Sequence, residues 1–173
     1  MERGIVIINT GDGKGKTTAA FGQALRTAGH DLPVCIIQFI KGQWPTGEGR
    51  AAQMLGGRVE IHVCGTGFTW QADCHESIVE AAQAGWLLAK EKIATGSYRL
   101  VVLDELTYLI TYGIISEKEV MEVLASRPTG MNIVITGRGA GQGLIDCADL
   151  VTEMREIKHP YRQGEPARKG IEY

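Results

Sequence analysis

Short apolar runs alternate along the chain with segments whose apolar residues recur at helical spacing. Apolar runs of this length predict buried strands, and a spacing of three or four predicts amphipathic helices. Strands separated by helices indicate βαβ crossovers, so we expect an α/β fold with a mostly parallel sheet of about six strands and helices on both faces. The strands are expected at residues 4–9, 34–40, 59–63, 99–103, 132–136 and 150–154.

Helix-capping residues and helix-ending glycines mark the bounds of the expected helices between these strands. One helix follows residue 17 and stops at Gly29, and capping-box patterns predict two more, from residue 73 to Gly96 and from residue 116 through Leu124. A polar, glycine-bearing segment is expected at 41–50, and an irregular loop is expected at 64–72. Residues 1–173 are interpreted as a single domain, in which the polar, proline-bearing tail 158–173 forms an extended C-terminal arm.

A glycine-rich loop follows the first expected strand and precedes the first helix. A strand, a loop ending in Gly-Lys-Thr and a helix are typical of a phosphate-binding loop, whose backbone N–H groups cradle anions. The first glycine of the usual pattern is replaced by Thr10, and the other interpretation is a glycine-rich turn with solvated lysines. The residues expected to bind nucleotide here are Gly11, Asp12, Gly13, Lys14, Gly15, Lys16, Thr17 and Thr18.

Two acids, Asp104 and Glu105, follow the expected strand at 99–103. In phosphate-loop proteins, a carboxylate at such a strand end holds Mg²⁺ together with the loop hydroxyl, so Asp104, Glu105 and Thr17 are the candidate ligands for a Mg²⁺ cofactor. The alternative is a helix-capping aspartate beside a solvated glutamate. Lys41 and Arg138 follow two other strands and either reach the same polyphosphate or are surface cations.

Two large aromatic residues, Phe68 and Trp70, lie in a glycine-flanked loop after the expected strand 59–63. If this loop lies at the carboxyl edge of the sheet, they offer a flat apolar wall for a large planar ligand. Packing of both rings into the core is the other interpretation.

Composition excludes several classes of protein. The formal net charge of −2 provides no broad electrostatic surface for nucleic acid, and we expect no nucleic-acid partner. No apolar run is long enough for a membrane span, and no targeting segment is recognised, so a cytoplasmic protein is expected. The four cysteines are scattered and are expected to be reduced thiols. Cys64 and His62, with Cys74 and His75, fit no zinc spacing.

Taken in order, the motifs resemble one family over nearly the whole chain: the phosphate-loop ATP:corrinoid adenosyltransferases, which act on cob(I)alamin or cob(I)yrinic acid a,c-diamide. The resemblance implies a P-loop NTPase-like, RecA-like fold and an enzyme of vitamin B12 synthesis. That enzyme moves the 5′-deoxyadenosyl group of ATP to the Co(I) of a corrinoid and releases triphosphate. The motifs are residues 11–18, 38–42 (Gln-Phe-Ile-Lys-Gly), 67–70 (Gly-Phe-Thr-Trp), 103–108 (Leu-Asp-Glu-Leu-Thr-Tyr), 136–138 (Thr-Gly-Arg) and 170–173 (Gly-Ile-Glu-Tyr).

The resemblance also implies roles for particular residues. The loop from Gly11 to Thr17 would cradle the triphosphate of a reversed ATP, and Thr17 and Glu105 would hold Mg²⁺. Phe68 and Trp70 would close the lower face of the corrin and favour reduction to Co(I). A homodimer and a flavoprotein reductant are implied as partners. Asp12 stands where family members often carry asparagine, and an acid beside a triphosphate is unfavourable unless it points away or binds a cation.

Two other functions remain open at this point. A phosphate-loop small-molecule kinase or NTPase would need a base or a water-positioning group, which the sequence does not identify. A nucleotide-gated corrinoid-binding module would use the aromatic loop as an anchor without turnover. Phosphoryl transfer would indicate the first function, and corrinoid binding without reaction would indicate the second.

Overall fold

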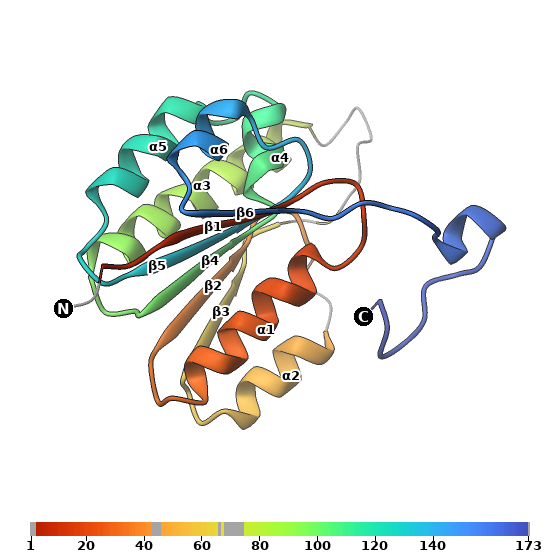
Figure 1. Ribbon diagram of the computed structural model, residues 1–173, viewed down its shortest axis with the longest axis horizontal. Coiled ribbons are helices and arrows are strands. Elements are labelled where there is room, and N and C mark those ends of the chain that lie inside the picture. Colours follow the sequence, from red (N-terminus) through yellow and green to blue (C-terminus); the bar gives the residue numbers. More distant parts are fainter. Residues whose placement is uncertain (1–2, 43–45, 66, 68–74, 173) are drawn as a thin grey trace.

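The computed structural model describes residues 3–42, 46–65, 67 and 75–172 and contains one six-stranded sheet in which every neighbouring pair of strands is parallel. The strand order is β3-β2-β4-β5-β1-β6 (Figure 1). The expected α/β sheet of about six strands is therefore confirmed. The strands are β1 (Val6–Thr10), β2 (Val34–Gln38), β3 (Val59–Val63), β4 (Leu100–Asp104), β5 (Asn132–Thr136) and β6 (Leu150–Glu153).

Helices cover both faces of this sheet, with α1 and α2 on one side and α3, α4, α5 and α6 on the other (Figure 1). Each face has its own apolar core. The strands β2 and β4, buried along their whole length, contribute to both cores. The helices are α1 (Lys16–Ala28), α2 (Gly47–Met54), α3 (His75–Ala94), α4 (Leu106–Thr111), α5 (Glu117–Ser126), α6 (Gln142–Cys147) and the 3₁₀ turn η2 (Pro160–Gln163).

Some expected helix signals are present, and others were missed. Ser116 caps α5 as predicted, because its hydroxyl accepts a hydrogen bond from the Glu119 backbone N–H at 3.1 Å. The predicted capping residue Asp73 lies outside the described residues. The helices α2, α4 and α6 were not predicted. Within the polar, glycine-bearing segment expected at 41–50, Thr46 caps α2 by accepting from the Gly49 N–H at 3.1 Å.

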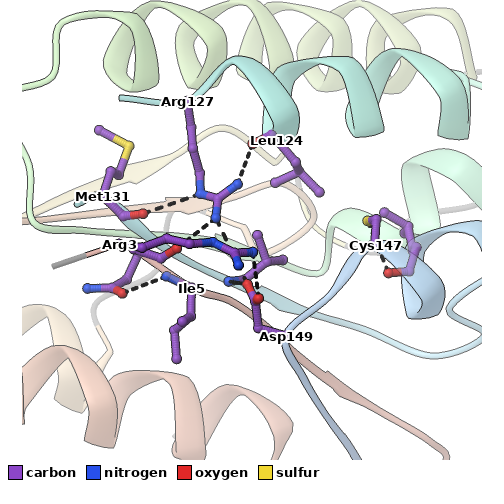
Figure 2. A network of polar contacts seen from close by, with 11 residues as sticks. Arg3, Ile5, Leu124, Arg127, Met131, Cys147 and Asp149 are labelled. Carbon is purple, nitrogen blue, oxygen red and sulfur yellow. Dashed lines mark hydrogen bonds and ion pairs between the residues drawn. The ribbon is translucent and has the colours of Figure 1, made fainter. Parts of the chain in front are cut away.

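A hydrogen-bond network around Arg127 connects elements at the N-terminal ends of the strands, on the side of the sheet opposite the glycine-rich loop (Figure 2). The Arg127 guanidinium donates to the carbonyl oxygens of Leu124 at 2.6 Å, Gly4 at 2.8 Å and Met131 at 3.3 Å. Its Nη2 atom also lies 4.0 Å from the carboxylate of Asp149, which accepts from the Val6 N–H at 2.9 Å. One side chain therefore joins the end of α5 to the starts of β1 and β6.

The C-terminal segment leaves the sheet after β6 and extends away from the body of the domain (Figure 1). The predicted extended arm is interrupted by η2, which follows His159. Near its end, Glu172 Oε1 lies 3.8 Å from Lys14 Nζ in the glycine-rich loop. In the described part of the chain, no helix combines the length and the apolar character that a membrane span requires.

Candidate nucleotide-binding site

The glycine-rich loop lies against the end of β6. The Gly13 N–H donates to the Met154 carbonyl at 2.7 Å, and the Met154 N–H donates to the Thr10 carbonyl at 2.8 Å. A Cβ atom at Gly11 would lie 2.4 Å from the Met154 oxygen, and the φ of Gly11 is +93°. Glycine is therefore required here both by backbone conformation and by space.

Lys16, the first residue of α1, lies largely buried beside the loop. Its side chain folds back so that Nζ donates to the Gly13 carbonyl at 2.7 Å. Burial lowers the pKa of Lys16, and the carboxylate of Glu105 opposes that shift. The structure therefore holds a cation next to backbone N–H groups at a helix N-terminus, an arrangement suited to a polyphosphate.

Asp104, at the end of β4, joins several elements of the site. The side chain is completely buried, and Oδ1 accepts from the hydroxyls of Thr17 at 2.8 Å and Thr136 at 2.7 Å. The other oxygen, Oδ2, accepts from Gln38 Nε2 at 2.9 Å and lies 3.8 Å from Lys41 Nζ. Because both oxygens already accept hydrogen bonds, Asp104 is suited to positioning Thr17 and the strand ends.

Glu105 has different surroundings from Asp104. Its φ of 66° is a left-handed conformation that is uncommon for a residue with a side chain. Its N–H donates to the Thr136 hydroxyl at 2.8 Å, and its Oε2 atom is buried with no hydrogen-bond partner among the described residues. Burial, and then the charge of Asp104, raise the pKa of Glu105 to about 7. A strained residue with an unsatisfied buried oxygen is typical of a functional position.

The residues present fit a bound Mg²⁺ ion. Mg²⁺ prefers oxygen ligands and usually takes one or two carboxylates together with phosphate oxygens and water. Glu105 offers a carboxylate oxygen that is not used elsewhere in the described structure. Thr17 gives its proton to Asp104 and keeps its oxygen lone pairs available. Metal binding by Thr17 and Glu105 stays a prediction, and Asp104, the third predicted ligand, is occupied by hydrogen bonds.

The predicted cations Lys41 and Arg138 both lie at this edge of the sheet. Arg138 Nη2 donates to the Asp12 carbonyl at 3.3 Å, and Nε lies 3.7 Å from the Asp12 carboxylate. The Asp12 side chain is 86% exposed and has a cation beside it. These are the conditions under which an acid is tolerated next to a phosphate site. Thr18 is exposed and lines a separate cavity between α1 and α2.

A cavity of about 530 Å³ opens over the loop and is bounded on its other side by the C-terminal segment. This boundary was not predicted, because a polar tail carries no signal of what it packs against. Gln38 and Thr136 were recognised only as parts of motifs, and their hydrogen bonds to Asp104 were not predicted. The cavity is lined by Asp12, Gly13, Lys14, Lys16, Arg138, Glu156, His159, Tyr161 and Arg162.

The predicted aromatic pair, Phe68 and Trp70, lies outside the described residues. The start of its loop is described: a Cβ atom at Gly65 would lie 2.3 Å from the carbonyl carbon of Ile40. The chain therefore leaves β3 in close contact with the segment that leads from β2 to Lys41. The aromatic loop begins at the same edge of the sheet as the cations and acids.

Comparison with known proteins agrees with this geometry. A family model described as ATP:corrinoid adenosyltransferase BtuR/CobO/CobP matches residues 2–173. Corrinoid adenosyltransferases from Escherichia coli (strain K12) and Salmonella typhimurium are each 45% identical over 172 residues, covering 99% of this chain and 87% of the relative. The Pseudomonas aeruginosa enzyme is 40% identical, covering 99% of this chain and 85% of its own.

A solved structure supports the fold alone. The flagellar accessory protein FlaH from Methanocaldococcus jannaschii superposes with a TM-score of 0.59 at 11% identity, over 88% of this chain and 72% of that protein. The P-loop NTPase-like fold is thus confirmed independently of sequence similarity. Because the family model covers almost every residue and the relatives match over nearly their whole length, this chain belongs to the ATP:corrinoid adenosyltransferase family.

Proposed function

We propose that this protein transfers the 5′-deoxyadenosyl group of MgATP to the Co(I) of a reduced corrinoid and releases triphosphate. The observation that carries the proposal is the buried oxygen of Glu105, which has no hydrogen-bond partner in the described part of the chain and lies beside a phosphate-binding loop, in a chain of this family. The loop and Lys16 supply the polyphosphate site, and Glu105 and Thr17 supply oxygen donors for the metal. A simple phosphate-binding module would have no use for the strained acid.

In the proposed reaction, Co(I) attacks C5′ of ATP. A cobalt–carbon bond forms, the bond between C5′ and the triphosphate oxygen breaks, and the electron pair of that bond leaves with triphosphate. Co(I) is already nucleophilic, so the protein needs no general base for this step. Its contribution is to hold C5′ against cobalt and to stabilise the charge that develops on the leaving group.

The described residues supply that charge stabilisation. Lys16 lies at the cavity and would bind the phosphates together with backbone N–H groups of the loop, and Arg138 adds a second cation at the edge of the cavity. When bound by Thr17 and Glu105, Mg²⁺ would neutralise further charge on the triphosphate. With the metal present, Glu105 serves as a ligand and is not available as a general base, which disfavours the kinase or NTPase function.

Four further features are part of the same proposal. Phe68 and Trp70 close the lower face of the corrin, a flavoprotein delivers the electron that makes Co(I), the active form is a homodimer, and the enzyme acts in the cytoplasm. The support for these features is the family to which the chain belongs.

An anaerobic assay tests the reaction. The protein, MgATP and chemically reduced cobalamin are mixed, the cobalt–carbon bond is followed by its light-sensitive absorption, and the phosphate products are separated. We expect adenosylcobalamin and triphosphate in equal amounts. ADP or orthophosphate without a cobalt–carbon bond would replace the proposal with the kinase or NTPase function. ATP binding without turnover would indicate the corrinoid-binding module.

A further inference from the structure

A second group of chemically reactive side chains lies on the sheet, away from the nucleotide site. Cys35 on β2 pairs in register with Glu60 on β3, and His62 follows Glu60 by two residues and therefore points to the same face. One ligand atom from each of these residues lies within 4.8 Å of the other two. The strand register brings them together, which is why sequence spacing around the cysteines did not predict the group.

This group is partly closed and partly open to solvent. The Cys35 side chain is completely buried, whereas the side chains of His62 and Glu60 are 26% and 39% exposed. Glu60 Oε1 lies 2.6 Å from His62 Nε2 and accepts from Lys92 Nζ at 2.8 Å, and the other Glu60 oxygen accepts from the Tyr98 hydroxyl. An ion could therefore enter past His62 and reach the thiol behind it.

We propose that Cys35, Glu60 and His62 form a binding site for one Zn²⁺ ion, with a fourth position open to water. A thiolate, an imidazole nitrogen and a carboxylate oxygen are the ligands that Zn²⁺ takes in proteins, and a site with three protein ligands keeps a coordination position free. The three ligand atoms lie within 4.8 Å of one another, and the 2.6 Å contact between His62 Nε2 and Glu60 Oε1 must widen to admit an ion with bonds of about 2.0–2.3 Å, so the side chains must rearrange slightly on binding.

At the proposed site, the Lys92 ammonium competes with the metal ion, and the Cys35 thiol must lose its proton. The Lys92 ammonium donates a hydrogen bond to the Glu60 oxygen that the metal would bind. This hydrogen bond must therefore break when the ion binds. Burial raises the pKa of Cys35 to about 12, so the free protein carries the thiol, and metal binding expels one proton. The hydrogen bond from Lys92, then that from Tyr98, lowers the pKa of Glu60 to about 2, which keeps the carboxylate ionised.

The full-length protein, prepared metal-free with its thiols reduced, is titrated with Zn²⁺ against a chromophoric chelator. We expect one equivalent to bind, and Co²⁺ in its place should give a thiolate-to-metal absorption band. Cys35→Ser and His62→Gln should each weaken the affinity at least about tenfold. Cys147→Ser, which changes an exposed thiol outside the site, is the matched control and should change nothing.

Lys92→Met provides a test in the opposite direction. Removing the competing cation should tighten Zn²⁺ binding several-fold, whereas a purely structural role of the network predicts no gain in affinity. The proposal is overturned if Zn²⁺ does not bind, if it binds equally to His62→Gln, or if Lys92→Met weakens binding. Because His62 is partly exposed, His62→Gln keeps the test decisive even if Cys35→Ser fails to fold.

Discussion

At the scale of the residue, Asp104 and Glu105 are neighbours in the chain with opposite environments. Asp104 is saturated with hydrogen bonds from Thr17, Thr136 and Gln38, whereas Glu105 has a left-handed backbone and a buried oxygen with no partner among the described residues. The strand-end position predicted both acids as candidate Mg²⁺ ligands, and only the family resemblance favoured Glu105. The local sequence could not distinguish them, because the difference depends on hydroxyl and amide groups from other elements.

Glu105 should make the stability of the ligand-free protein depend on pH. The unfolded chain ionises this carboxyl near pH 4.5, whereas the folded protein keeps it protonated up to about pH 7. The folded state binds the extra proton in this window, so the free energy of unfolding should fall as pH rises through it, by on the order of 3 kcal/mol. Glu105→Gln should remove that fall and be more stable than the parent at pH 8.

Urea unfolding of both proteins at pH 4.5 and pH 8, without nucleotide or Mg²⁺, measures this difference. The free energies of unfolding of the two proteins should differ little at pH 4.5. An equal loss of stability in the parent and in Glu105→Gln between the two pH values would contradict the prediction.

Lys16 and Lys14 form a matched pair for testing the loop. Lys16 is buried and contacts the loop carbonyl of Gly13, whereas Lys14 is 42% exposed and pairs with Glu172. We expect Lys16→Ala to abolish adenosyl transfer and to weaken ATP binding by at least about a hundredfold, as loss of a charge-assisted phosphate contact requires. Lys14→Ala should weaken ATP binding much less. Calorimetric titration with MgATP compares them, and equal affinities for Lys16→Ala and the parent would refute the assignment.

At the scale of the element, the strands could be predicted and the short helices could not. Buried parallel strands appear as apolar runs, so the sequence located both ends of all six strands within two residues. The helix α6 begins in a glycine-rich segment, and its Leu144 N–H is capped at 3.1 Å by the carboxylate of Glu117 from α5. A Cβ atom at Gly141 would lie 2.3 Å from that carboxylate. Such a partner is a tertiary contact that local sequence does not contain.

Arg127 should be a principal determinant of stability at the edge opposite the site. Arg127→Met removes three hydrogen bonds to carbonyl groups and the ion pair with Asp149, so we expect a loss of about 2–4 kcal/mol in the free energy of unfolding. Arg3→Ala, in which the exposed partner of Asp149 is lost, should cost less than about 1 kcal/mol. Denaturant unfolding compares the two, and similar losses would show that the guanidinium is not the key contact.

The loop after β3 should act on reduction more than on nucleotide binding. If Trp70 closes the lower face of the corrin, Trp70→Ala should leave ATP affinity unchanged and slow adenosylation that starts from Co(II). Transfer from pre-reduced Co(I) should be much less affected. Parallel assays from the two cobalt states test this, and an equal loss in both would remove Trp70 from the reduction step.

At the scale of the whole molecule, the site is built from both ends of the chain. The loop near the N-terminus and the segment after β6 face each other across the cavity, and Lys14 and Glu172 form an ion pair between them. None of the residues from 158 onward belongs to either apolar core of the described structure. The arm thus contributes to the nucleotide site while adding nothing to those two cores.

Deletion of residues 158–173 should therefore weaken nucleotide binding while leaving the stability of the fold nearly unchanged. We expect the thermal midpoint to shift by no more than a few degrees, because no core contact is lost, and the Kd for MgATP to rise several-fold, because His159, Tyr161 and Arg162 no longer line the cavity. Glu172→Ala, which removes the ion pair with Lys14 and a hydrogen bond from the Arg168 N–H, is the milder control. Unchanged nucleotide affinity after the deletion would show that the arm is only an appendage.

The hydrogen bond from Thr17 to Asp104 has a consequence for chemical selectivity. A hydroxyl has one proton, and Thr17 donates its proton to a carboxylate that is fully buried and cannot turn away. The oxygen can then present only lone pairs to whatever lies above the loop. This oxygen repels a hydrogen-bond acceptor such as a phosphate oxygen and attracts a cation. We therefore expect the site to prefer nucleotide with bound metal over nucleotide without it, before any bond is broken.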